Sequence, residues 1–280
     1  MKAFVTGETD SIGGHLVHLL EEHGYSIIAL GRDELKGAML NSQQTTFKSV
    51  DITDRGALAE AFETVDVVFH CAALSSVWGD AQDFQRVNVQ ASRYVLECCE
   101  NFLVKRLVYV SSTSVYFDFT DRILLTEDQV LEQGFANEYA KSKYQAEQLL
   151  LAERKSTDVV IIRPRGIIGD GDTSIMPRIL RVANKGFFPL FNRGQAMVDV
   201  TYVKNVAHAL QLAGKQPNID GQCYNISNLE PVTVKALLER VLHKRKNKVV
   251  FIPVAYPLMY GLAWLFEATA KLLSLGEPSI

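Results

Sequence analysis

Short runs of β-branched and aliphatic residues alternate with amphipathic stretches from the start of the chain. The alternation begins with Lys2–Thr6, Ile12–His23 and Ser26–Leu30. Strands connected in this way through helices run parallel, because the crossover helix returns the chain to the end where the previous strand began. Further segments of strand composition are Thr46–Val50, Asp66–His70, Arg106–Ser111 and Asp158–Arg163. Six or seven such units predict an α/β fold with a doubly wound parallel sheet.

Helical periodicity fills most of the intervals between these strands, most clearly at Phe84–Phe102 and Asn137–Arg154. From about Gly166 the pattern loosens into loops punctuated by Gly and Pro. Later segments have the composition of a helix, a short strand, a second helix and a final apolar helix, the first three at Val203–Ala213, Cys223–Ile226 and Val234–His243. We therefore predict a core at residues 1–165 and a smaller lobe at residues 166–280 that is intertwined with the core.

Charge and cysteine content limit the function classes. The 280 residues include 29 Lys and Arg against 32 Asp and Glu, a net charge of -3, which lacks the basic excess of a nucleic-acid-binding protein. The four cysteines show no CxxC spacing, and the chain enters the strand-like Ala3-Phe4-Val5 without room for a secretion signal. We expect a cytoplasmic protein with reduced thiols, no metal site and no nucleic-acid partner.

A glycine-rich turn follows the first strand and opens the first helix. Gly7 permits a tight turn from strand to helix, and Gly13 lets the helix pack closely on the sheet. Because the N-terminus of a helix attracts anions, this turn is a candidate site for the pyrophosphate of a dinucleotide.

The residue that contacts the adenosine ribose is expected about 20 residues further on, at the end of the second strand. That position reads Gly31-Arg32-Asp33. An acidic residue would select NAD by binding the 2′-hydroxyl, whereas the guanidinium of Arg32 can pair with the 2′-phosphate of NADP. We favour NADP, with NAD still possible through Asp33.

Tyr139 and Lys143 form a YxxxK pair in a predicted helix. The i,i+4 spacing places the phenol and the ammonium on one face. A nearby cation favours the phenolate and so enables proton transfer near neutral pH. The strand that precedes this helix ends in Ser111-Ser112-Thr113-Ser114-Val115-Tyr116.

Together these motifs resemble the extended short-chain dehydrogenase/reductase superfamily, also called the NAD-dependent epimerase/dehydratase superfamily. Its TGxxGxxG fingerprint matches from Thr6, except that Asp10 occupies the middle glycine position. A carboxylate there adds bulk and negative charge beside the pyrophosphate, unless Asp10 turns outward to cap the helix. The SSxxVY segment of the family makes Ser112 the catalytic serine, which orients the substrate oxygen beside Tyr139. The resemblance implies a Rossmann fold and a homodimer formed through the helices at Phe84–Phe102 and Asn137–Arg154.

The resemblance also assigns roles to residues at other strand ends. Asp51 and Ile52 match a pair that contacts adenine, and Asn88 matches a structural asparagine near the active site. His70-Cys71-Ala72-Ala73 ends the fourth strand, where small residues allow the cofactor ribose to approach. The cofactor-binding residues implied in this way are Gly7, Asp10, Ser11, Ile12, Gly13, Arg32, Asp51, Ile52, Cys71, Ala72, Ala73, Tyr139, Lys143 and Pro164.

Two features narrow the branch of the superfamily. Val198 stands where nucleotide-sugar epimerases carry the arginine that meets a diphosphate. Val198–Ala209 instead resembles the VDFTYVxNVxxAH run of the 3β-hydroxysteroid dehydrogenase-like branch. We predict an NAD(P)-dependent oxidoreductase that transfers hydride between the nicotinamide and an apolar hydroxy or keto substrate, steroid-like or fatty-chain. The alternatives are a nucleotide-sugar epimerase and a catalytically weak dinucleotide-binding relative.

The stretch Pro253–Glu267 is rich in large hydrophobic residues but too short to span a bilayer. It could wall an apolar pocket, lie on a membrane surface as a peripheral contact, or pack on the sheet. Relatives usually continue beyond this point, so the chain could be short or cut at its C-terminus.

Overall fold

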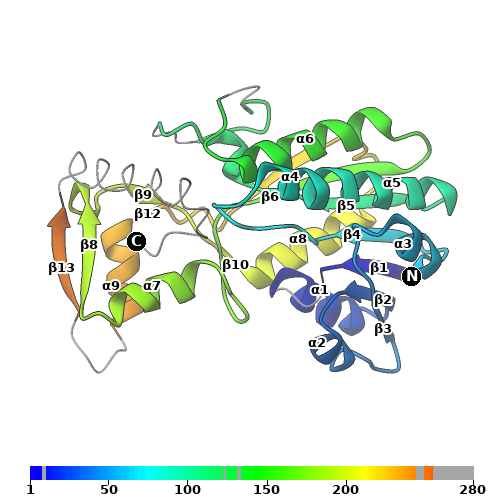
Figure 1. The fold of residues 1–280 in the computed structure, drawn as a ribbon, viewed down its shortest axis with the longest axis horizontal. Coiled ribbons are helices and arrows are strands. Elements are labelled where there is room, and N and C mark those ends of the chain that lie inside the picture. The colour runs from blue at the N-terminus through cyan, green and yellow to red at the C-terminus, as the bar shows by residue number, and fades with distance from the viewer. Residues whose placement is uncertain (8–10, 121, 123, 131–133, 244–248, 255–280) are drawn as a thin grey trace. The chain divides into compact units, whose positions relative to one another are not determined.

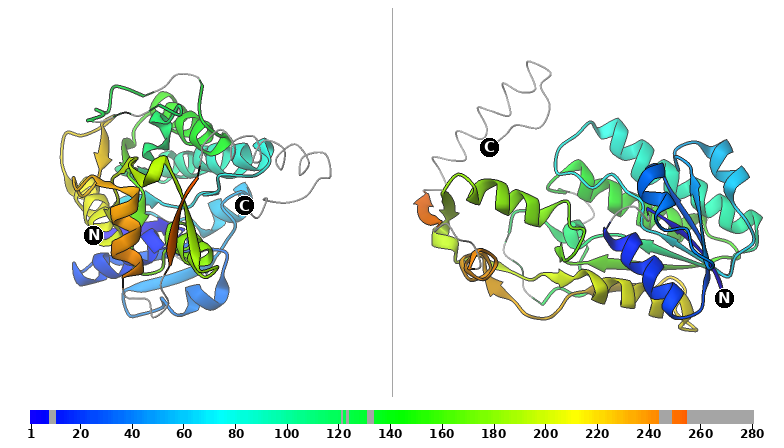
Figure 2. Two further views of the ribbon diagram at one scale, coloured as in Figure 1. Left: turned by 90° about the vertical axis from the view of Figure 1, so that its left-hand side faces the viewer. Right: turned by 90° about the horizontal axis from the view of Figure 1, so that it is seen from below.

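The computed structural model describes residues 1–7, 11–120, 122, 124–130, 134–243 and 249–254. The chain forms two compact units, shown in Figure 1 and, from two further directions, in Figure 2. Unit 1 comprises Met1–Gly171 and Thr201–Ser227, and unit 2 comprises Asp172–Val200 and Asn228–Ile280. Asp10, the basic run at 244–246 and all but the first two residues of the apolar stretch at 253–267 lie outside the described residues.

A seven-stranded parallel sheet organises unit 1. Its strand order is β11-β6-β5-β4-β1-β2-β3. The strands are β1 Lys2–Thr6, β2 Ser26–Gly31, β3 Thr45–Ser49, β4 Val67–His70, β5 Arg106–Val110, β6 Asp158–Pro164 and β11 Cys223–Ile226. The sequence prediction of a doubly wound parallel sheet is confirmed.

Helices cover both faces of this sheet, as Figure 1 shows. Side chains alternate along each strand, so Phe4 packs with one set of helices while Ala3 and Val5 pack with the other. The first set is α3 Arg55–Ala61, α5 Ala91–Asn101 and α6 Glu138–Glu153, and the second is α1 Ser11–Glu22 and α8 Val203–Lys215. Two buried apolar layers thus hold the ends of the strands in place.

The predicted helix at Phe84–Phe102 has a more complex form. It consists of α4 Ala81–Phe84, a π-helical segment η1 Gln85–Gln90 and α5. Asn88 lies in the π-helical segment and is 1% exposed. Such π-bulges are energetically unfavourable and occur where a side chain must be re-aimed.

Smaller elements complete unit 1. The helix α2 spans Glu34–Ala38 and the 3-10 helix η2 spans Thr113–Tyr116, while β7 Ile167–Ile168 pairs in parallel with β10 Thr201–Tyr202. Through this pairing the chain returns to unit 1 after an excursion into unit 2. The predicted boundary at residues 165 and 166 lies six residues before Gly171, where the first segment of unit 1 ends.

Unit 2 contains regular structure where the sequence predicted loops. The helix α7 spans Ile175–Ala183, and β8 Phe187–Phe191 pairs in parallel with β13 Val250–Val254. The other elements are η3 Asn192–Gly194, β9 Met197–Val198, β12 Val232–Thr233 and α9 Val234–Leu242. The loop prediction for residues after Gly166 was therefore wrong for α7 and β8. Within the described residues of the whole chain, no helix combines the length and apolar character needed to cross a membrane.

Candidate active site

The carboxyl ends of β1, β4, β5 and β6 lie side by side in the sheet. The crossover connections reverse direction between β1 and β4, and ligands of open α/β sheets bind at such a switch point. The predicted residues Gly7, Cys71 to Ala73, Ser112 and Pro164 all lie at or just after these strand ends.

Gly7 and Ala72 form a close backbone approach. Gly7 has a φ of 75°, and its N–H donates to the Leu30 carbonyl oxygen at 2.9 Å. A Cβ atom added at Gly7 would lie 2.6 Å from the backbone nitrogen of Ala72. No side chain fits between the two strand ends, so this position requires glycine. Ser11, at the start of α1, donates from its hydroxyl to the carbonyl oxygen of Asp170 at 2.9 Å.

Asp51 lies among donors and cations after β3. Burial raises the pKa of its carboxyl, but hydrogen bonds from the backbone and hydroxyl of Thr53 and the charges of Arg32 and Arg86 outweigh this effect, so the pKa is lowered. Arg86 comes from the π-helical segment and also donates to Asp83 at 3.0 Å. Sequence reasoning missed Arg86, because nothing near it in the chain links it to this strand end.

Asp33 uses its carboxylate to cap a helix. The side chain accepts a hydrogen bond from the backbone N–H of Lys36 at 3.0 Å, at the N-terminus of α2. Arg32 beside it is exposed. This contact occupies one carboxylate oxygen of Asp33, the residue through which NAD binding was still considered possible.

Tyr139 lies in the first turn of α6, which Asn137 caps by accepting from the Ala140 N–H at 2.8 Å. Burial raises the pKa of the Tyr139 phenol, and side-chain hydrogen bonds with Ser112 and Ser75 oppose the rise. The structure thus brings Ser112 and Tyr139 together as predicted. It adds Ser75, from the loop after β4, which sequence reasoning missed because it carries no motif of its own.

Lys143 lies one helical turn after Tyr139 in α6 and is 1% exposed. Its Nζ donates to the Val110 carbonyl oxygen at 2.6 Å and lies 4.2 Å from the centre of the Tyr109 ring. Burial lowers the pKa of Lys143 to about 7, although Glu147 and Cys71 act in the opposite direction. That this cation favours the phenolate form of Tyr139 stays a prediction.

Asn88 connects the loop after β4 to the helix that carries Tyr139. Its carbonyl oxygen accepts from the Leu74 N–H at 2.7 Å, and its amide donates to the Leu74 carbonyl at 3.2 Å and to the Ser142 hydroxyl at 2.9 Å. Ser142 in turn donates to the Tyr139 carbonyl oxygen at 2.8 Å. The π-helical segment therefore re-aims Asn88 so that it fixes Leu74, the neighbour of Ser75, relative to Tyr139.

His70, the last residue of β4, is buried and lies within hydrogen-bond distance of two hydroxyl groups. The ring nitrogens of His70 lie 2.7 Å from the Thr6 hydroxyl and 3.0 Å from the Ser92 hydroxyl. Burial, followed by the charge of Lys143, lowers the pKa of His70 to about 3. His70 is therefore neutral at physiological pH, and it braces β1 against α5 beneath the strand ends.

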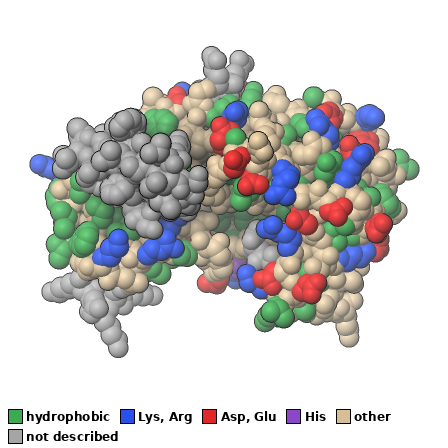
Figure 3. All heavy atoms as spheres, in the orientation of Figure 1, with side chains coloured by type: hydrophobic (Ala, Val, Ile, Leu, Met, Phe, Trp, Pro, Cys, Tyr) green, Lys and Arg blue, Asp and Glu red, His purple; other side chains and the backbone are tan. Residues whose placement is uncertain are grey.

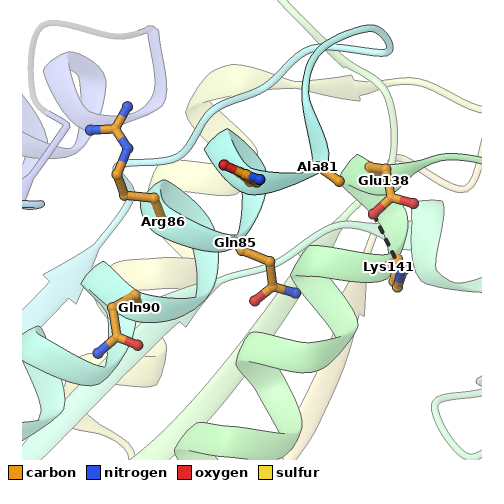
Figure 4. A pocket seen from close by; sticks show the side chains of 7 residues that line it. Ala81, Gln85, Arg86, Gln90, Glu138 and Lys141 are labelled. Carbon is orange, nitrogen blue, oxygen red and sulfur yellow. Dashed lines mark hydrogen bonds and ion pairs between the residues drawn. The ribbon is translucent and has the colours of Figure 1, made fainter.

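A groove on the outer surface lies between α4–η1 and α6. Figure 4 shows Gln85 and Arg86 on one side and Glu138 and Lys141 on the other, with the Glu138–Lys141 ion pair drawn. None of the predicted catalytic or cofactor-binding residues lines it. Within the described residues, no group of three or more His, Cys, Asp or Glu side chains is arranged to hold a metal ion.

Comparisons with known proteins agree with this architecture. The sequence profile of the NAD dependent epimerase/dehydratase family matches residues 3–227. The 2-alkyl-3-oxoalkanoate reductase of Shewanella oneidensis is 30% identical over 99% of this chain and 75% of its own length. The decarboxylating sterol-4-alpha-carboxylate 3-dehydrogenase of Mus musculus is 29% identical over 98% of this chain and 76% of its own length. Among solved structures, MoeE5 in complex with UDP-glucuronic acid and NAD superposes with a TM-score of 0.78 at 25% identity, covering 91% of this chain and 86% of the other.

The Rossmann sheet and the similarity to named dehydrogenases and reductases define an NAD(P)-dependent enzyme of the extended short-chain dehydrogenase/reductase class. The chain belongs to the NAD dependent epimerase/dehydratase family.

Proposed function

We propose that this enzyme is an NADP-preferring reductase or dehydrogenase of apolar keto or hydroxy compounds, either steroid-like or fatty-chain. The observation that carries the proposal is the position of Ser112 directly after β5, at the carboxyl edge of the sheet, with Tyr139 and the buried Lys143 one turn apart on α6, which packs on the η2 segment that follows Ser112. Two relatives are named for a sterol carboxylate and an oxoalkanoate, and both names support an apolar substrate.

Each of the three residues has a separate task. Burial raises the pKa of Tyr139, so the phenol is protonated at neutral pH and can donate a proton to a carbonyl oxygen. Ser112 donates a hydrogen bond to the same substrate oxygen and so orients it. Lys143, held by Val110, supplies positive charge beneath the phenol and a donor for the cofactor ribose.

The nicotinamide cofactor supplies or accepts the hydride when it is bound. The turn that begins at Gly7 and leads to the N-terminus of α1 would hold its pyrophosphate. Cys71, Ala73 and Pro164, with Ser11, Ile12 and Gly13 on the first helix, would line the rest of the dinucleotide. Asp51 and Ile52 would contact the adenine.

The preference for NADP rests on Arg32 and Asp33. The Asp33 carboxylate caps α2, whereas the Arg32 guanidinium is exposed beside the strand end. An exposed guanidinium suits a 2′-phosphate. Substrate binding is assigned mainly to residues 166–280. Val198 there replaces the arginine that meets the diphosphate in nucleotide-sugar epimerases.

Steady-state kinetics with a ketosteroid, a long-chain 3-keto ester and a UDP-sugar tests the reaction. We expect NADPH oxidation with one of the two apolar ketones. The Tyr139→Phe variant should lower kcat by about 10²- to 10⁴-fold with little change in cofactor affinity. Conversion of the UDP-sugar without net cofactor oxidation would instead establish the epimerase. Dinucleotide binding without turnover of any of the three substrates would leave the catalytically weak relative, and failure to bind either dinucleotide would contradict all three functions.

Fluorescence titration with NADPH and NADH tests the cofactor preference. The parent protein should bind NADPH more tightly, and Arg32→Gln should weaken NADPH binding by about tenfold. NADH binding to the same variant is the matched control and should change little. Equal losses for both cofactors would contradict a role for Arg32 at the 2′-phosphate.

The proposal includes a cytoplasmic homodimer formed through α4–η1–α5 and α6. These helices pack on each other and present Gln85 and Lys141 along the groove of Figure 4. Light scattering should give twice the chain mass, and Lys141→Glu should shift the protein toward monomer. Lys105→Glu, an exposed cation away from these helix faces, is the control. A parent protein that is monomeric at micromolar concentration would contradict the dimer.

A further inference from the structure

One face of the β8–β13 ribbon in unit 2 is wholly apolar. The two strands pair in parallel, with Val250 opposite Phe187, Ile252 opposite Pro189 and Val254 opposite Phe191. Residues two apart on a strand share a face, so these six side chains lie on the same side of the ribbon. They include no polar residue.

Four of these six side chains are exposed, whereas the opposite face is partly buried, with Pro253 as its exposed residue. Phe187, Phe191, Val250 and Ile252 are 42%, 44%, 61% and 44% exposed. Leu190, which points to the other side, is 4% exposed. Single exposed hydrophobic side chains are common on protein surfaces, but a contiguous exposed apolar patch indicates a site that binds a protein, a membrane or a ligand. The exposed side chains of this face form such a patch.

Positive charge lies at both ends of β8. Lys185 precedes the strand by two residues, Arg193 follows it by two, and both are exposed. Within the described part of the chain, no carboxylate forms an ion pair with either of them. Figure 3 shows hydrophobic side chains along the edge where Figure 1 labels β13 and β8, with Lys and Arg side chains nearby.

The charge of the whole unit has the same sign. Unit 2 contains 11 Lys and Arg against six Asp and Glu, a net charge of +5, whereas unit 1 contains 18 against 26, a net charge of −8. The chain's overall charge of -3 conceals this division. An anionic partner is therefore attracted to unit 2 and repelled by unit 1.

We propose that the apolar face of the β8–β13 ribbon, flanked by Lys185 and Arg193, docks unit 2 onto an anionic phospholipid surface. Apolar side chains enter the boundary between headgroups and acyl chains while the cations meet lipid phosphates. A second copy of the chain is a poorer occupant, because a two-fold contact would bring the same unpaired cations of both copies together. The inference does not depend on the proposed reaction.

Flotation with phosphatidylcholine vesicles, with and without phosphatidylglycerol, tests the proposal on the full chain. We expect binding to the anionic vesicles, weakening as salt is raised. Lys185→Gln with Arg193→Gln should lower the partition coefficient by about fivefold for each charge removed. The exposed cations Lys105 and Lys215 of unit 1, replaced in the same way, are the control and should change binding little.

The apolar contribution is tested with Phe191→Ser combined with Ile252→Ser. This variant should lose roughly tenfold or more in partitioning. Leu35→Ser with Met39→Ser is the matched control, since both residues are 84% exposed in unit 1. Circular dichroism melts and NADPH titration show whether the variants stay folded, and the charge variants test the surface even if an apolar variant does not fold.

Three results would overturn the proposal. Equal binding to neutral and anionic vesicles would remove the role of the cations. Unchanged binding of the ribbon variants would place the contact elsewhere. Self-association that the ribbon variants abolish, without vesicle binding, would make the face a protein interface.

Discussion

The two units bury different kinds of side chain. Within the described residues, every buried polar or charged side chain belongs to unit 1, including His70, Lys143, Glu147 and Arg163. Among the described residues of unit 2, the buried hydrophobic side chains are Ala183, Leu190, Leu238 and Leu242. The interior of unit 1 therefore contains ionisable side chains, some of them close to the candidate active site, whereas several large apolar side chains of unit 2 are exposed.

The difference follows from what each unit must do. Buried ionisable groups are costly unless they are paired and hydrogen-bonded, so a large and well-packed interior is needed to hold them. The double-sided sheet of unit 1 supplies it. A two-stranded ribbon is marginal by itself and cannot bury both faces.

The largest effect is expected at the buried ion pair of unit 1. Arg163 donates to both oxygens of Glu147 at 2.9 and 2.7 Å, and the two side chains are 4% and 0% exposed. Glu147→Gln leaves the Arg163 guanidinium with no counter-charge, and we expect a loss of about 3–5 kcal/mol in the free energy of unfolding. Urea denaturation measures it.

Glu153→Gln is the control for this change. Glu153 lies on the same helix and forms a bidentate pair with Arg93, but both side chains are well exposed. Its removal should cost no more than about 1 kcal/mol. Similar losses for the two variants would show that burial does not set the value of these pairs.

The second effect concerns Asn88. Asn88→Ala removes three hydrogen bonds and leaves the Leu74 N–H and the Ser142 hydroxyl without this partner. We expect a loss of about 1–3 kcal/mol in the free energy of unfolding, together with a lower kcat, since Leu74 precedes Ser75. Asn41→Ala is the control, because Asn41 accepts from Phe47 at an exposed site. A stability loss with unchanged kcat would limit Asn88 to a structural role.

The sequence predicted the sheet well and the helix through Asn88 incompletely. Runs such as Arg106–Val110 are apolar on both faces of the sheet, and this local pattern suffices to predict a buried parallel strand. The π-helical segment at Gln85–Gln90 depends on the bonds of Asn88 to Leu74 and Ser142, which are distant in the chain. No local pattern encodes such contacts.

The site shows the same division. Ser112, Tyr139 and Lys143 lie in motifs with fixed spacing, and the structure brings Ser112 to Tyr139. Ser75 and Arg86 reach the site only through the loop after β4 and the helix that follows it. The direction of the Tyr139 pKa shift also depends on burial, which the spacing of a YxxxK pair does not reveal.

A third effect, which is small near neutral pH and grows as the solution is acidified, is the pH dependence that His70 imposes. The pKa of His70 is lowered from 6.5 to about 3 in the folded chain, chiefly by burial. Below pH 6.5 the unfolded chain binds a proton that the folded chain does not, so stability falls as pH decreases toward 3. The slope should be about 1.4 kcal/mol per pH unit, and His70→Gln should remove it.

Glu100 provides the comparison for this pH window. Burial raises the pKa of its carboxyl, but hydrogen bonds from Ser156, Lys155 and Thr157 outweigh burial and lower the pKa from 4.5 to about 2. Its stabilising contribution is present above pH 4.5 and is lost as pH falls toward 2. Glu100→Gln should therefore lower stability by a constant amount above pH 4.5 and change the slope of the stability curve only between about pH 2 and 4.5. A change of slope between pH 4.5 and 6.5 would contradict the assignment of that window to His70.

The smallest effect is expected in unit 2, at Ile252. Ile252 is 44% exposed on the ribbon face, whereas Ile161 in β6 is 0% exposed. Ile252→Ala should change the free energy of unfolding by no more than about 0.5 kcal/mol, because little packing is lost. Ile161→Ala leaves a cavity and should cost about 2–5 kcal/mol. The same substitution thus reports how each unit uses its apolar side chains, and a loss at Ile252 that matches the loss at Ile161 would mean that the ribbon face is part of a folded interior.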